Sequence, residues 1–173
     1  NEDNICEPVN YYGLSKLACE NIINQGFQNK KNSFAILRYF NVVGSVLNYR
    51  IKKKTKSLLD IIADNIKKSR YKININGKKL NTLDGTPERD FIHISDLCQI
   101  HKKVYKYLKK KEKVVLNCGS GQRYSVLQIA KGFEKLTKRK FKISHRKNLK
   151  HETQTICSDN SLLKKLLKIE IKK

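Results

Sequence analysis

Hydrophobic and polar residues follow two different periods along the chain, and each period predicts one kind of element. Apolar residues spaced three and four apart predict helices at residues 10–25, 57–69, 95–110, 126–138 and 160–168. Short runs that alternate or are continuously apolar predict strands at residues 33–44, 71–76, 89–94, 114–121 and 141–145. Since helices and strands alternate, we predict an α/β fold with mostly parallel strands.

Local signals add detail to these elements. Asn10, Ser95 and Ser125 each stand where a polar side chain would cap the start of a helix. The segment 33–44 is continuously apolar and ends in Gly, which predicts a strand buried on both faces. Residues 77–90 carry turn signals, and the lysine-rich stretch 49–56 is expected to be a surface loop.

Size and charge narrow the class of protein. The chain has 173 residues, 39% of them hydrophobic, which is enough for the core of one domain. It begins with Asn1 and contains no Met, so we expect it to be a piece of a longer chain. The formal net charge of +23 would favour anionic partners. The basic residues are mostly scattered Lys, however, which favours a solvated surface and predicts neither a nucleic-acid nor a membrane partner.

The cysteines suggest a reducing compartment. Five of them are widely spaced without a CxxC pair, which predicts free thiols, no zinc or other metal site, and a cytoplasmic protein. No apolar run approaches the length that spans a membrane.

One helix carries a candidate catalytic pair, Tyr12 and Lys16 in the stretch NYYGLSKLACE. Positions four apart share a helix face, and an ammonium group there favours the deprotonated phenol. The spacing alone carries no information, because the chain contains four Tyr–Lys pairs of this kind. Only this pair has a small Gly and Ser between its members, and only it is followed by a predicted strand with a polar Asn41 near its end, where open α/β sheets bind ligands.

Four blocks then occur in order: YGLSKLACE, LRYFNVVG, TLDGTPERDFIHISDL and LNCGSGQRYSVLQI. Their order and spacing resemble the UDP-glucose 4-epimerase family of extended short-chain dehydrogenase/reductases, from about residue 5 to about residue 168. The resemblance implies the C-terminal part of a Rossmann-like NAD(P)-binding fold with a small α/β substrate-binding portion. It implies that residues 1–45 are the second half of the dinucleotide-binding domain. Residues 46–173 would mainly bind the UDP-sugar, with some elements returning to the Rossmann sheet.

The resemblance also implies a reaction, which is NAD-dependent epimerisation at C4 of a UDP-hexose through a 4-keto intermediate. Tyr12 would be the acid/base, and Lys16 would support it and hold the nicotinamide ribose. Tyr39 and Phe40 would lie beside the nicotinamide, and Asn41 would hydrogen-bond the UDP-sugar. Plain core packing is an equally good reading of Tyr39 and Phe40 from the residues alone.

Further residues would bind the substrate. Arg89 matches an arginine that grips the diphosphate, although pairing with Asp84 or Asp90 would otherwise be the simpler reading. Asn74 and Asn76 fall where the family clamps uracil. His93 and Asp96 match family positions too and are expected to be structural.

The chain departs from the family pattern near its end. A second diphosphate arginine falls on Leu149, and the Asp that follows it falls on Glu152. Arg146 or Lys147 would have to substitute for that arginine.

The glycine-rich loop that holds a dinucleotide pyrophosphate is not found in the chain. Gly119 and Gly121 come closest, but Tyr124 stands where a third glycine would be. The family's catalytic Ser or Thr is also missing, and both features would precede Asn1. We therefore expect a fragment that is inactive alone.

Two alternatives stay open. One is another nucleotide-sugar epimerase or a 4,6-dehydratase. The other, from a different class, is a basic non-catalytic protein that binds nucleic acid or other anions, with tight and steeply salt-dependent DNA binding. The sequence leaves open a homodimer, and it does not decide whether the sugar is N-acetylated.

Overall fold

The computed structural model describes residues 1–27, 32–45, 57–77, 79–110, 113–146 and 153–172. The predicted surface loop at 49–56 lies outside these residues. The described elements follow in this order: α1 (Tyr11–Gly26), β1 (Phe34–Tyr39), β2 (Asn41–Val43), α2 (Leu58–Lys67), β3 (Lys72–Asn76), β4 (Glu88–His93), α3 (Ile94–Leu108), β5 (Lys113–Cys118), β6 (Arg123–Ser125), α4 (Val126–Thr137), β7 (Lys142–Arg146), β8 (Thr155–Ile156) and α5 (Ser161–Leu167).

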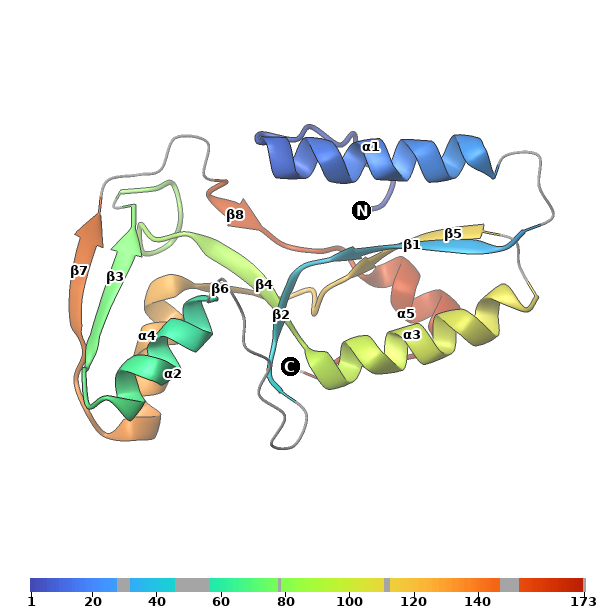
Figure 1. Cartoon of the computed structure of the whole chain (residues 1–173). Coiled ribbons are helices and arrows are strands. Elements are labelled where there is room, and N and C mark those ends of the chain that lie inside the picture. Colours follow the sequence, from blue (N-terminus) through green and yellow to red (C-terminus); the bar gives the residue numbers. More distant parts are fainter. Residues whose placement is uncertain (28–31, 46–56, 78, 111–112, 147–152, 173) are drawn as a thin grey trace.

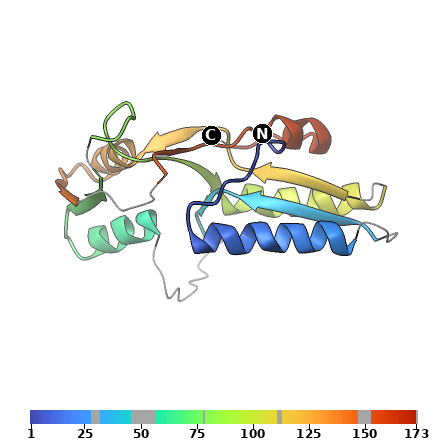
Figure 2. The same ribbon diagram turned by 90° about the horizontal axis from the view of Figure 1, so that it is seen from above.

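The first layer is the parallel pair β1–β5, in register from Phe34 opposite Lys113 to Tyr39 opposite Cys118. α1 runs along one face of this pair, while α3 and α5 lie on the other (Figure 1). Figure 2 shows the same part from above, with α1 in front of β1. This is the alternating, parallel α/β arrangement that the hydrophobic pattern predicts.

A second group of strands surrounds β4. β2 and β8 pair with β4 in parallel, and β6 pairs with it antiparallel. β3 and β7 form a separate parallel pair, which α2 and α4 accompany at the other end of the molecule (Figure 1). β4 therefore leads from the part with β3 and β7 to the part with β1 and β5.

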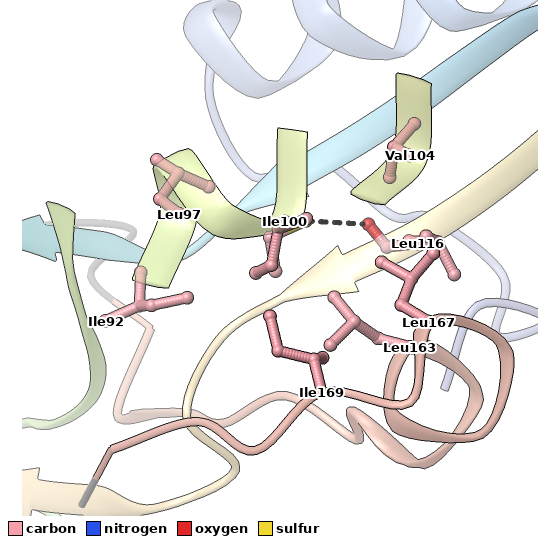
Figure 3. Packing of buried hydrophobic residues seen from close by; sticks show 9 residues of the cluster. Ile92, Leu97, Ile100, Val104, Leu116, Leu163, Leu167 and Ile169 are labelled. Atoms are coloured by element: carbon pink, nitrogen blue, oxygen red, sulfur yellow. Dashed lines mark hydrogen bonds between the residues drawn. The ribbon is translucent and has the colours of Figure 1, made fainter. Parts of the chain in front are cut away.

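Two clusters of buried side chains match this division. The first core is made of Ile92, Leu97, Ile100, Val104, Leu116, Cys118, Leu163, Leu167 and Ile169. Figure 3 shows how α3, β5 and the C-terminal segment contribute to it. The second core is made of Ile62, Ile73, Ile75, Ala130 and Phe141. Residues beyond 45 thus contribute to both cores, and the domain division at residue 45 stays a prediction.

The helix starts depend on local polar contacts. Asn10 Oδ1 accepts a hydrogen bond from the Gly13 amide at 2.8 Å, so Asn10 caps α1 as predicted. Ser125 caps α4 in a reciprocal arrangement with Gln128, also as predicted. The cap predicted at Ser95 is wrong. α3 begins at Ile94, and His93 is the cap, with its ring accepting from the Ser95 amide.

The predicted strand 33–44 is also partly wrong. The chain breaks at Phe40, so that β1 pairs with β5 and β2 pairs with β4. β1 is not buried on both faces, because Ile36 is its one buried residue and α1 buries none of its own. The short strands β6 and β8 have no signal in the hydrophobic pattern, since both form through pairing with β4.

Candidate active site

The predicted catalytic pair lies on the first turns of α1. Tyr12 is 73% exposed, and Lys16 Nζ lies 5.2 Å from the centroid of its ring. No hydrogen bond to the Tyr12 hydroxyl is formed by the residues that the structure describes. The phenol is therefore free to meet a ligand, with a cation held beside it.

Gly13, next to the tyrosine, has a packing reason to be small. A Cβ atom at this position would lie 3.1 Å from Pro8 Cβ, in the segment that precedes the helix. The close approach of Pro8 and the Asn10 cap fix how the chain enters α1. Tyr11, the first helical residue, is 91% exposed.

The second group of predicted residues lies where the chain passes from β1 to β2. Tyr39 ends β1 and is 51% exposed, and the half-buried Phe40 donates its amide to the Cys118 carbonyl at 3.4 Å. Asn41 starts β2 and is exposed, which corrects the expectation of a buried Asn at a strand end. The end of β1 and the start of α1 lie at the same end of the β1–β5 pair (Figure 1).

Tyr39 has a partner that sequence reasoning missed, which is His101 on α3. The Tyr39 hydroxyl and His101 Nε2 are 2.7 Å apart, and the two rings meet edge to face at 5.7 Å. Burial, with a smaller contribution from Cys118, raises the pKa of Tyr39. His101 stands 62 residues further along the chain in a lysine-rich helix, so no local signal links it to Tyr39.

A second missed contact fixes α1 on β1. The Arg38 guanidinium binds the Glu20 carboxylate through Nε and through a terminal nitrogen, at 3.0 and 2.8 Å. It also donates to the Glu2 carbonyl at 3.1 Å. The hydrogen bond with Glu20 raises the pKa of Arg38. Such a two-point contact orients the helix that carries Tyr12 relative to the strand that carries Tyr39.

Arg89, the predicted diphosphate ligand, is half-buried in the middle of the β4 group. Its guanidinium donates to the carbonyl of Glu88 at 2.8 Å and to that of Gln154 at 3.2 Å. Its neighbours in register are Tyr124 on β6 and Ile156 on β8.

Asp84 and Asp90, the two carboxylates that offered a simpler pairing for Arg89, accept hydrogen bonds from other residues. Asp84 accepts from Thr86 and Ser125. Asp90 accepts from Ser120, Gly121 and Ser158.

The predicted uracil residues lie on the β3–β7 pair. Asn74 and Asn76 alternate with buried isoleucines and therefore share the face turned away from the second core. Ser144 donates to the Asn74 side chain, and Arg146 stands opposite Asn76 in register. The structure thus places Arg146 beside Asn76, at the carboxyl end of the pair.

Gly119 and Gly121, whose spacing comes closest to a dinucleotide-binding loop, have structural roles instead. A Cβ on Gly119 would lie 2.5 Å from Asp90 Oδ2, and the Gly121 amide donates to the same carboxylate at 3.0 Å. Gly121 adopts a φ of +76°, which favours glycine. These glycines therefore wrap a buried aspartate.

His93 and Asp96 make contacts that support α3. His93 caps the helix, and Asp96 is buried and accepts from the Lys172 amide at 3.1 Å. Leu149, Glu152 and Lys147, which bear on the second diphosphate arginine, lie outside the described residues.

All five cysteines are free thiols, and burial raises the pKa of Cys118 to about 12. In the described ranges, no group of three or more His, Cys, Asp or Glu side chains is arranged to hold a metal ion. None of the helices described is both long and apolar enough to cross a bilayer.

The chain is similar to known sugar-nucleotide enzymes. Residues 1–119 match the model of the NAD dependent epimerase/dehydratase family. A UDP-glucose 4-epimerase of Rhizobium meliloti is 30% identical over 164 residues, covering 92% of this chain and 50% of the relative. A UDP-glucose 4-epimerase of Streptococcus mutans is 36% identical over 137 residues, covering 77% of this chain and 41% of the relative. The chain thus spans about half the length of the relatives it matches.

Solved structures agree with this match. UDP-glucose 4-epimerase from Bifidobacterium longum, in complex with NAD+ and UDP, superposes with a TM-score of 0.85 at 28% identity, over 95% of this chain and 50% of that one. UDP-glucose-4-epimerase from Stenotrophomonas maltophila, with bound NAD and formylated UDP-arabinopyranose, superposes with a TM-score of 0.84 at 26% identity, over 94% of this chain and 50% of that one. The fold is therefore the Rossmann-like epimerase fold, and the chain belongs to the NAD dependent epimerase/dehydratase family.

Proposed function

We propose that this chain is the C-terminal part of an enzyme that epimerises UDP-glucose and UDP-galactose at C4. The observation that carries the proposal is the Tyr12–Lys16 pair at the start of α1, at the same end of the β1–β5 pair as the end of β1, in a chain of this family (Figure 1). Family membership supports the reaction class, and the names of the relatives support the C4 position and the UDP-hexose.

The residues at this end of the β1–β5 pair fit a nicotinamide cofactor. The exposed Tyr12 phenol, the Lys16 ammonium and the half-exposed Tyr39 ring offer polar groups and an aromatic surface at one end of the β1–β5 pair. Bound NAD supplies hydride transfer to and from C4 of the sugar. Lys16 would hold the nicotinamide ribose, and Tyr39 and Phe40 would lie beside the ring.

Tyr12 then carries the proton chemistry. Its phenolate oxygen would take the proton of the sugar 4-hydroxyl as C4 is oxidised, and the resulting hydroxyl would return a proton to the sugar oxygen when the 4-keto sugar is reduced on its other face. The UDP portion would be bound by Asn41, Arg89, Asn74, Asn76 and Arg146. Arg89 suits the diphosphate because a guanidinium can contact two phosphate oxygens at once.

The pyrophosphate loop of such a site would have to come from a segment before Asn1. We therefore propose that the 173 residues are a fragment, that they are inactive alone, and that the complete protein also contains that segment. Another nucleotide-sugar epimerase or a 4,6-dehydratase remains the alternative within the family.

The test is Tyr12→Phe in the complete protein. Losing an acid/base group should lower the turnover of UDP-galactose by at least about 100-fold, while UDP binding is retained. Turnover is measured by release of UDP-glucose, and UDP binding by calorimetry.

Tyr105→Phe is the matched control. Lys109 Nζ lies 5.0 Å from the Tyr105 ring on α3, so this pair has the same spacing and cation–ring geometry. Tyr105→Phe should leave the turnover of UDP-galactose unchanged. Full turnover by Tyr12→Phe would remove Tyr12 from the mechanism.

A further inference from the structure

The contact between Tyr39 and His101 extends further than the two rings. His101 Nε2 lies 2.7 Å from the Tyr39 hydroxyl, and His101 Nδ1 lies 2.8 Å from the Leu97 carbonyl, one turn earlier on α3. The backbone of α3 is thus linked through the imidazole to a side chain at the carboxyl end of β1.

The chemistry of the Leu97 carbonyl, the His101 imidazole and the Tyr39 hydroxyl fixes the direction of both hydrogen bonds. A carbonyl oxygen only accepts, so Nδ1 carries the hydrogen and donates to Leu97. In the neutral imidazole Nε2 then has no hydrogen and must accept. The Tyr39 hydroxyl is therefore the donor, in agreement with the raised pKa that keeps this phenol protonated.

This arrangement has a consequence for a ligand. The single hydrogen of the Tyr39 hydroxyl is engaged with His101, so the oxygen presents only lone pairs on its open side. Tyr39 is 51% exposed at the end of β1. A ligand group that meets the Tyr39 oxygen must then be an N–H or O–H donor.

We propose that His101 is a positioning residue of the cofactor site, which fixes the Tyr39 ring and makes its oxygen a hydrogen-bond acceptor for the bound dinucleotide. The inference rests on the proposed function, because it assigns Tyr39 to the NAD site. His101 itself does not touch the reacting atoms.

The test compares two amides at position 101 of the complete protein. The side-chain amide of His101→Gln ends at the same bond count from Cα as Nε2, so its oxygen can accept from Tyr39. His101→Asn reaches only the position of Nδ1 and leaves the Tyr39 hydroxyl without this acceptor. The measured quantity is the dissociation constant for NAD.

His101→Asn and Tyr39→Phe should each weaken NAD binding about 5- to 10-fold, the value of one hydrogen bond. The double variant should be no weaker than either single one, because both remove the same contact. His101→Gln should bind NAD almost as well as the unmodified protein. If His101→Gln binds NAD as weakly as His101→Asn, or if the effects of His101→Asn and Tyr39→Phe add, His101 is not a positioning residue.

A nitrogen NMR spectrum of the histidine side chains at about pH 8.5, above the range in which histidines ordinarily titrate, checks the direction separately. Hydrogen on Nδ1 of His101 is expected, and hydrogen on Nε2 would overturn the inference. If the unmodified complete protein binds no NAD, the proposed function fails and the inference fails with it. If it binds NAD and the variants do not follow the pattern, only the inference fails.

Discussion

Two carboxylates fix the loops around β4. Asp90 is fully buried and accepts hydrogen bonds from the amides of Ser120, Gly121 and Ser158 and from two serine hydroxyls. Its partners come from two segments, Ser120 and Gly121 from the one after β5 and Ser158 from the one after β8. A buried charge of this kind is tolerated because each of its oxygens is well supplied with donors.

Asp84, in the segment before β4, has a similar role. It accepts from Thr86 at 2.7 Å and from Ser125, the cap of α4. Burial alone would raise the pKa of Asp84, but the hydrogen bonds from Ser125 and Thr86, together with the charge of Lys131, bring the pKa below its ordinary value.

The lowered pKa makes a prediction about acid stability. A carboxyl whose pKa is lower in the folded state adds stability above its unfolded pKa, about 3.9, and loses it as the pH falls through the folded pKa. Asp84→Asn should therefore reduce the free energy of unfolding at neutral pH by about 1 kcal/mol or more and flatten its fall between about pH 5 and pH 2. Urea denaturation at a series of pH values measures both effects.

Asp3→Asn, an exposed aspartate near the start of the chain, is the control for the loss of one negative charge. It should change neither quantity by much. An unchanged pH dependence in Asp84→Asn would contradict the role given to this carboxylate.

At the scale of elements, long and short segments differ in what holds them. α3 and α5 are placed by the first core, to which they contribute Leu97, Ile100, Val104, Leu163 and Leu167. β6 and β8 have only three and two residues and exist through their pairing with β4. α5 is also held at its end, where Lys103 donates to the carbonyls of Leu167 and Lys168.

Adjacent leucines on α5 test the first core. Leu163 is fully buried, whereas Leu162 is 36% exposed. Leu163→Ala should lower the free energy of unfolding by about 2–5 kcal/mol, because it leaves a cavity in the first core. Leu162→Ala should cost less than about 1 kcal/mol. Equal effects of the two substitutions in urea denaturation would contradict the packing described for α5.

At the scale of the whole molecule, the predicted site residues fall into separate groups along the two parts. Tyr12, Lys16, Tyr39 and Phe40 belong to the part with β1 and β5, and Asn74, Asn76 and Arg146 belong to the part with β3 and β7. Arg89 lies on β4, which leads from one part to the other. A UDP-sugar that meets Tyr12 and is bound by Arg89 and the β3–β7 residues would therefore have to span both parts.

The fragment proposal makes a prediction about the chain alone. The purified 173 residues should not convert UDP-galactose and should bind NAD weakly, because the loop for the pyrophosphate would come from another segment. A coupled assay for UDP-glucose and a titration with NAD measure these properties. The complete protein is the positive control, and turnover by the 173 residues alone would refute the proposal.

Most helices and strands, and the family, can be predicted from the sequence alone. Helix caps such as Asn10 and Ser125 act over three residues, and the period of apolar positions is a local property, so both can be predicted without a fold. The four motif blocks carry the family resemblance for the same reason, since each lies within one short stretch of chain.

Features that depend on residues far apart in sequence are visible only in the folded chain. The break at Phe40 arises because β1 and β2 pair with different strands, and the cap of α3 moves to His93 at the end of β4. Gly119 and Gly121 serve the buried Asp90, and Tyr39 meets His101 across 62 positions. These contacts need chain segments to be brought together, and a hydrogen bond between distant residues leaves no period or spacing in the sequence to predict it from.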